Sequence, residues 1–185
     1  MSRLYTFAAE DSSVTGDIYK NGTIYTINKS TTSIRCGKTQ TSPFPEYRAY
    51  FSYNTSSLSG KVILSAVVTL YVGTITQSGG ITSLDVLLTC GWDDVSADMN
   101  LTSTDWFRGG APWDGSIIGL TQNTSYSLPS ALPPSNFVNL SGYTDFRIMS
   151  TTALTTGQSW LSNWTLKDTY LTVVTDEKVY YTFGG

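Results

Sequence analysis

Residues that could do chemistry are concentrated in one stretch of the sequence, residues 91–119. It contains three tryptophans and five aspartates but only one basic residue, Arg108. Tryptophan rings can stack on the C–H faces of sugars, while carboxylate and guanidinium groups beside them bind the sugar hydroxyls. The stretch therefore predicts a loop that binds a glycan. Its candidate ligand-binding residues are Trp92, Asp94, Asp105, Trp106, Arg108 and Trp113.

The same stretch allows three other interpretations. One or two of its tryptophans could fill an end of a β-sandwich, because tryptophan is usually mostly buried. Asp93, Asp94 and Asp98 could hold Ca²⁺ through their oxygens, although the spacing of an EF-hand is absent. Asp105 and Asp114 could face each other as the acid pair of a glycoside hydrolase. Acids in a glycine-rich loop are more often solvated or capping, so we predict no catalytic residue, no enzyme and no resident cofactor, with Ca²⁺ as the alternative.

The two cysteines, Cys36 and Cys90, also allow two interpretations. They are too few for a disulfide scaffold and lack the spacing of metal ligands. They could be separate buried thiols that pack as small apolar residues. Alternatively, one disulfide could tie an early strand to a strand in the middle of the chain, if the fold brings the two Cα atoms close together.

The composition excludes several classes of function. With no histidine among 185 residues, the chain has no Ser-His or Cys-His dyad and no imidazole metal ligand. A pI near 4.7 and a net charge of −3 argue against binding nucleic acid. The sequence has no apolar run long enough to span a membrane. The first residues show no apolar core of a signal peptide, which leaves open a removed leader or a protein used without this route of export.

The elements that must position these residues are β-strands. Residues 66–72 alternate so that Ala66, Val68, Leu70 and Val72 share one face, and residues 84–90 alternate in the same way. Further strands are predicted at residues 4–8, 17–27, 33–37, 48–53, 143–149, 168–175 and 178–183. Turn signals such as Asn21-Gly22, Ser78-Gly79-Gly80 and Pro133-Pro134 lie between these runs.

Many short strands separated by such turn signals predict an all-β fold, an antiparallel, jelly-roll-like β-sandwich. Residues 1–185 form a single domain in this prediction, with a long Trp/Asp-rich loop at residues 91–119. Residues 122–139 contain three prolines and are expected to cross the fold irregularly. Trp160 and Trp164 are expected to be packing residues just before the last strands.

One segment resembles a known family. Residues 47–72 read YRAYFSYNTSSLSGKVILSAVVTLYV, in which a strand, a Ser-Ser-Leu turn, a glycine and Ile-x-Ser-Ala precede an alternating strand. This order resembles the DNRLRE-type domain, and residues 164–175 resemble its closing strand. Asn54 and Thr169-Tyr170 depart from the family pattern. The resemblance implies a β-sandwich of the kind found in extracellular and virion proteins and related to carbohydrate-binding modules.

Glycosylation sequons are far more frequent than chance predicts. Seven of the eight asparagines begin Asn-x-Ser/Thr, in a chain with 52 serine and threonine residues. Either the protein is glycosylated on an exterior surface, or polar turns have accumulated these residues. Both interpretations give outer sheet faces that are rich in hydroxyls and poor in charge, which a protein in a repeating assembly tolerates better than a free monomer.

These observations predict a non-enzymatic structural protein of a virion or an extracellular surface, such as a capsid decoration, a spike, a tail part or a filament subunit. Its expected partners are further copies or other assembly subunits and a surface glycan, with no nucleic acid and no membrane span. The alternative is a carbohydrate-binding module. A small hydrolase acting on glycans is a further alternative, which no residue constellation supports.

Overall fold

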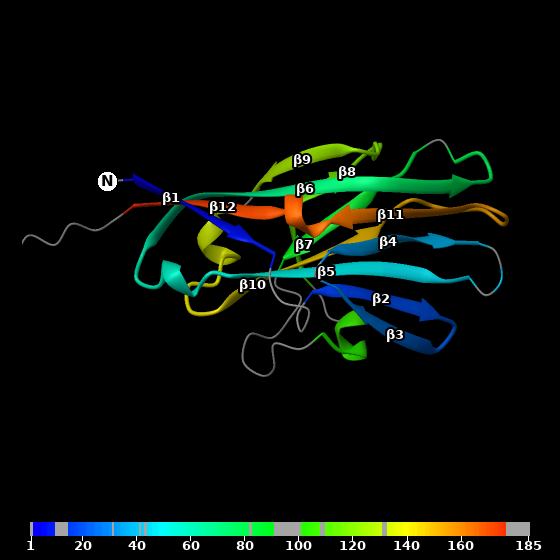
Figure 1. Ribbon diagram of the computed structural model, residues 1–185, viewed down its shortest axis with the longest axis horizontal. Helices are drawn as coiled ribbons and strands as arrows, with labels where there is room; N and C mark the ends of the chain where they lie inside the picture. The colour runs from blue at the N-terminus through cyan, green and yellow to red at the C-terminus, as the bar shows by residue number, and fades with distance from the viewer. Residues whose placement is uncertain are drawn as a thin grey trace, which may run out of the picture.

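The computed structural model is an all-β antiparallel fold (Figure 1). It describes residues 2–9, 15–30, 32–40, 42, 44–81, 83–90, 101–107, 110–130 and 133–176. The strands in these ranges are β1 (Ser2–Ala8), β2 (Gly16–Asn21), β3 (Ile24–Lys29), β4 (Ser33–Thr39), β5 (Glu46–Asn54), β6 (Val62–Ser78), β7 (Val86–Cys90), β8 (Ala111–Ile117), β9 (Thr124–Pro129), β10 (Tyr143–Ser150), β11 (Ser159–Thr165) and β12 (Tyr170–Asp176). The short 3-10 helices are η1 (Ser56–Leu58), η2 (Ser103–Trp106), η3 (Pro134–Asn136) and η4 (Leu166–Asp168).

The strands form one curled sheet in the order β1-β12-β6-β11-β4-β5-β10-β7-β8. In addition, β2 joins β5 to β3, and β9 pairs with β6. The pairing of β6 with β11 and with β12 shifts register once each, and such bulges bend a strand. The curl lets the two halves of the sheet enclose one large core, as expected for a jelly-roll-like sandwich.

The inward faces predicted from alternation are confirmed. Ala66, Val68, Leu70 and Val72 of β6 are all buried, as are alternate residues of β7. In the half of the sheet that contains β7, Phe51 of β5 stacks on Phe146 of β10 with ring centroids 5.5 Å apart. Burial of these side chains is the main stabilising contribution to the fold.

Two strands lie where the sequence predicted irregular structure. The expected loop at residues 91–119 contains η2 and β8, and the expected irregular crossing at residues 122–139 contains β9. Residue propensities did not predict these two strands, because β8 contains Pro112 and Gly115 and β9 ends in Pro129. Proline is tolerated at sheet edges, and pairing with β7 and β6 imposes the extended conformation.

Other predicted boundaries also change. Residues 17–27, predicted as one strand, form the β2–β3 hairpin, with Gly22 at φ +60° in its turn. Trp160 and Trp164 are packing residues, but they lie within β11 rather than before the last strands. The strand predicted at residues 178–183 lies outside the described residues.

The structure records Cys36 and Cys90 as buried thiols, so the disulfide interpretation is wrong. The reason is topological, because β5 and β10 lie between β4, which carries Cys36, and β7, which carries Cys90. The thiol of Cys90 instead donates to the carbonyl oxygen of Phe137 at 3.7 Å.

Neither thiol is expected to react in the native protein. Burial raises the pKa of Cys36 well above its usual value, which removes the reactive thiolate. Iodoacetamide at pH 8 should leave the folded chain unmodified, and the same treatment in denaturant should alkylate both cysteines, as measured by mass spectrometry. A denatured, unreduced chain that takes up no label would contradict the prediction.

Two of the sequons form turns. In each, the asparagine side-chain oxygen accepts both the N–H and the hydroxyl of the serine two residues later: Ser56 to Asn54 at 3.2 and 2.7 Å, and Ser141 to Asn139 at 3.0 and 3.1 Å. This Asx turn is completed best by a hydroxyl-bearing residue at that position. At these two sites the Asn-x-Ser pattern has a structural role of its own.

Candidate functional site

Trp113 was predicted to bind a glycan, but in the structure its side chain is inaccessible. Trp113 lies in β8 with an exposed fraction of 0%, and its ring meets Phe146 with centroids 4.9 Å apart. Its indole N–H donates to the carbonyl of Leu128 at 2.9 Å. A fully buried indole offers no face to a sugar, so the interpretation of a tryptophan that fills the sandwich is the correct one here.

Asp105 and Trp106 are also buried, in η2. The Asp105 carboxylate accepts the backbone N–H of Thr102 at 2.6 Å and forms a capping box with this residue. The Arg48 guanidinium lies 4.0 Å from the centre of the Trp106 ring, and its Nη1 donates to the Trp106 carbonyl at 2.8 Å. Asp105 therefore closes the first turn of η2, while Trp106 and Arg48 fasten η2 to the sheet. Neither Asp105 nor Trp106 is presented to a ligand from solvent. Trp92, Asp93, Asp94, Asp98 and Arg108 lie outside the described residues.

A buried polar row lies on the sheet face that η2 covers. The Ser52 hydroxyl donates to Asp145, and Arg147 is 5% exposed, with a pKa lowered by burial. Burial raises the pKa of neighbouring Tyr50, whose hydroxyl donates to the Asp105 carbonyl at 3.4 Å. These groups interact with one another inside the protein, so the row supports the packing of η2.

A different set of residues forms an open site where the two halves of the sheet meet. β4 pairs with β11 along its whole length but with β5 only at Gly37 and Lys38. Farther along β5, its edge is taken by β10. Beyond Gly37 and Lys38, β4 therefore diverges from β5 and β2. The sheet surface is concave where β4 and β5 separate, and this place is called here the step.

The step contains a groove of about 330 Å³, called here the corner groove. Paired residues place Thr76, Leu161, Gly37, Tyr47 and Tyr19 in one row across five strands, with their side chains on the same face. Gly37 contributes no side chain to this row, so space remains between Leu161 and Tyr47. The groove is lined by Lys38, Thr39, Pro45, Tyr47, Thr76, Ser159, Trp160 and Leu161.

Only glycine fits at the floor of this step. Gly37 has φ +149°, and a Cβ atom there would lie 2.3 Å from the carbonyl oxygen of Trp160. The close approach of β4 to β11 thus requires the same residue whose missing side chain leaves room for the groove.

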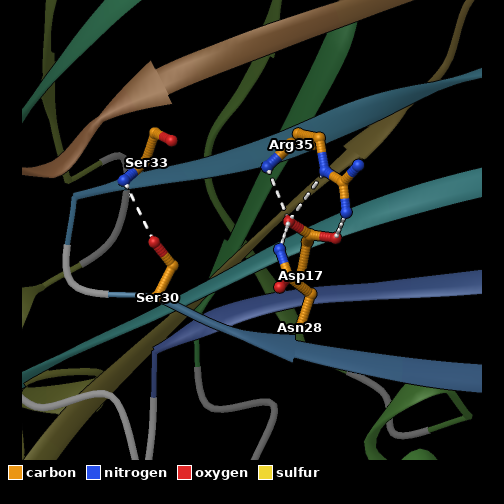
Figure 2. Close-up of polar contacts among 5 residues, drawn as sticks. All are labelled: Asp17, Asn28, Ser30, Ser33 and Arg35. Carbon is orange, nitrogen blue, oxygen red and sulfur yellow. Dashed lines mark hydrogen bonds and ion pairs between the residues drawn. The ribbon is translucent and has the colours of Figure 1, made fainter.

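An ion pair braces the step (Figure 2). Asp17 of β2 is fully buried, and Arg35 of β4 donates to both of its carboxylate oxygens, from Nη2 at 3.0 Å and from Nε at 3.2 Å. Asn28 of β3 donates to the same carboxylate at 3.2 Å, and Figure 2 shows Asp17 held between these two side chains. Desolvation lowers the pKa of Arg35, but the hydrogen bonds and charge of Asp17 together with the charge of Tyr47 raise it, and the net shift is upward.

The same arginine helps to order Tyr47, a tyrosine that lines the groove. The Arg35 guanidinium lies 4.7 Å from the centre of the Tyr47 ring, and Tyr19 packs against Tyr47 with centroids 4.7 Å apart. Arg35 comes from β4 and Tyr19 from β2, on opposite sides of β5. Tyr47 is therefore held in place before any ligand arrives, which reduces the entropy lost on binding.

Sequence reasoning missed this site because its residues come from five strands whose pairing no local pattern reveals. One signal was present. Gly37 ends the predicted strand at residues 33–37, and a glycine in a strand often marks a close approach of two backbones.

No protein-family model matches the chain, and no curated protein matches it either. Within the described ranges, no helix is long and apolar enough to cross a membrane. In the same part of the chain, no three His, Cys, Asp or Glu side chains gather as metal ligands would.

Proposed function

We propose that this protein is a non-enzymatic component of a virion or an extracellular surface, and that it contacts glycans through the corner groove. The observation that carries the proposal is the groove itself, an open concave site lined by Tyr47, which Arg35 and Tyr19 hold in place. Leu161, Pro45 and Tyr47 supply apolar surface for the C–H groups of a sugar ring. Thr39, Thr76 and Ser159 supply hydroxyls, and Lys38 supplies an ammonium group, for the polar edge of the sugar.

The chemistry of the groove favours binding over reaction. The described residues that line it include no carboxylate, and the nearby Asp17 is engaged by Arg35 and Asn28. General acid–base catalysis needs a proton-transferring group within reach of the substrate. The groove residues offer contact surface and hydrogen bonds instead.

The assembly part of the proposal is supported by the outward side chains of β1 and β12. Leu4, Thr6 and Ala8 of β1 stand beside Val174, Thr172 and Tyr170 of β12, and none of them carries a charge. Soluble antiparallel sheets usually turn polar or charged side chains to water. The middle of this face carries no charge, and the charged Asp176 lies beside Ser2 at its end. Such an uncharged patch is suited to contact with another protein surface.

Blocking the corner groove is expected to abolish glycan binding. Thr76 is exposed, so Thr76→Arg should fill the groove without disturbing the core, and binding to oligosaccharides selected on a glycan array should fall at least about tenfold. Isothermal titration calorimetry measures the change.

Ser125→Arg is the matched control, because it adds the same charge at an exposed strand position of β9. Binding that survives Thr76→Arg, or a wild-type protein that retains no glycan, would reject the groove as the site. Equal loss in both variants would point to a charge effect rather than to the groove.

A further inference from the structure

The edges of the sheet are protected unequally. In the part of the chain that the structure describes, β1 and β8 end the main path, while β3 and β9 each pair with one strand. Natural sheets protect edges with proline or lysine against pairing with another chain. β8 contains Pro112, β9 contains Pro129 and β3 ends in Lys29. The seven residues of β1 include neither proline nor lysine, and their one charge, Arg3, lies near the start of the strand.

The side chains of β1 are also incompletely covered. Leu4 on the outer side is 64% exposed. On the inner side, Tyr5 and Phe7 pack on the core but remain half-buried, with ring centroids 6.4 Å apart. An additional strand beside β1 would cover all three side chains and pair the backbone groups of the edge.

We propose that β1 pairs with β1 of a second copy of this chain, antiparallel and about a two-fold axis at Tyr5. The inference rests on the proposed assembly role and names its partner. Two-fold pairing of identical edges closes on itself and leaves no new edge for further growth.

The sequence of β1 fits its own copy in this register. This register pairs all seven residues of β1, with Tyr5 opposite Tyr5, Leu4 opposite Thr6 and Arg3 opposite Phe7. No like charges are opposed, and each arginine faces an aromatic ring. The two Leu4 side chains become diagonal neighbours, close enough to contact. A strand with charges near its middle would set them against Leu4, Tyr5 and Phe7, so a second β1 matches the edge better.

A charge-swap experiment tests both the partner and the register. Leu4 and Thr6 are exposed, so the double variant L4K/T6K should fold normally while placing two lysine pairs face to face across the axis. Sedimentation equilibrium should show wild-type chains of 20.2 kDa forming dimers, and L4K/T6K should weaken the dimer at least about tenfold. The variant L4K/T6E places lysine opposite glutamate and should restore the dimer.

Ile118→Lys is the control, because it introduces a lysine at an exposed apolar residue far along the chain, 75% exposed. It should leave the dimer unchanged. A wild-type protein that stays monomeric at about 200 µM would overturn the proposal, and so would an L4K/T6K variant that dimerises as tightly as wild type. If L4K/T6E dissociates as readily as L4K/T6K, the register is wrong. Glycan binding by L4K/T6K should equal that of wild type, which keeps this test separate from that of the corner groove.

Discussion

Replacing Trp113 by alanine is expected to destabilise the protein rather than to remove a sugar contact. The fully buried indole packs against Phe146 and Phe137, and its loss leaves a large cavity and removes the hydrogen bond that it donates to the Leu128 carbonyl. Such truncations cost about 3 to 5 kcal/mol of the free energy of unfolding. For a chain of this size, the melting temperature should fall by roughly 10 °C, as measured by differential scanning calorimetry.

Phe107→Ala provides the comparison, because Phe107 follows η2 and is 71% exposed. Its effect should stay within about 0.5 kcal/mol. A Trp113→Ala protein that melts at the wild-type temperature but no longer binds glycan would instead restore the interpretation of Trp113 as a ligand-binding residue.

The second large effect is expected at Arg35. Among the described residues, Arg35→Ala leaves the fully buried Asp17 carboxylate with hydrogen bonds from Asn28 and from the backbone N–H of residue 35. Removing one partner of a buried pair usually costs 3 to 5 kcal/mol, and because the Arg35 side chain is one-third exposed we expect about 2 to 4 kcal/mol. Urea unfolding followed by tryptophan fluorescence measures this loss.

The double variant Asp17→Asn/Arg35→Ala separates the ion pair from general packing. It leaves no unpaired buried charge, so its loss of stability should be smaller than the sum of the losses of the two single variants. Lys29→Ala, at an exposed cation of β3, should change stability by less than about 0.5 kcal/mol. Additive losses at Asp17 and Arg35 would contradict the bracing role of this pair.

Strand alternation could be predicted from the sequence because it is a local property. The faces of β6 and β7 followed from a period of two residues, and the structure buries the residues that this period selected. β8 and β9 could not be predicted in this way, because their extended conformation comes from pairing with β7 and β6 rather than from their own prolines and glycine.

The candidate site was predicted less well than the fold. Residue type suggested that tryptophans and aspartates in residues 91–119 would meet a ligand, but type alone does not distinguish an exposed ring from a buried one. Trp106 and Trp113 are buried, and Asp105 caps a helix. The sequence did not indicate Gly37 or Tyr47 as site residues, because the groove beside them exists only where β4 diverges from β5.

By itself the sequence determined a β-rich, weakly charged protein without histidine, and the inward faces of its principal strands. These follow from composition and from the order of neighbouring residues. Only the tertiary structure decided which polar residues meet. Asp17, Arg35 and Tyr47 are distant in the chain and are joined where β4 crosses from one half of the sheet to the other. Strand order is set by packing of the whole core, so a site built across five strands depends on all of them.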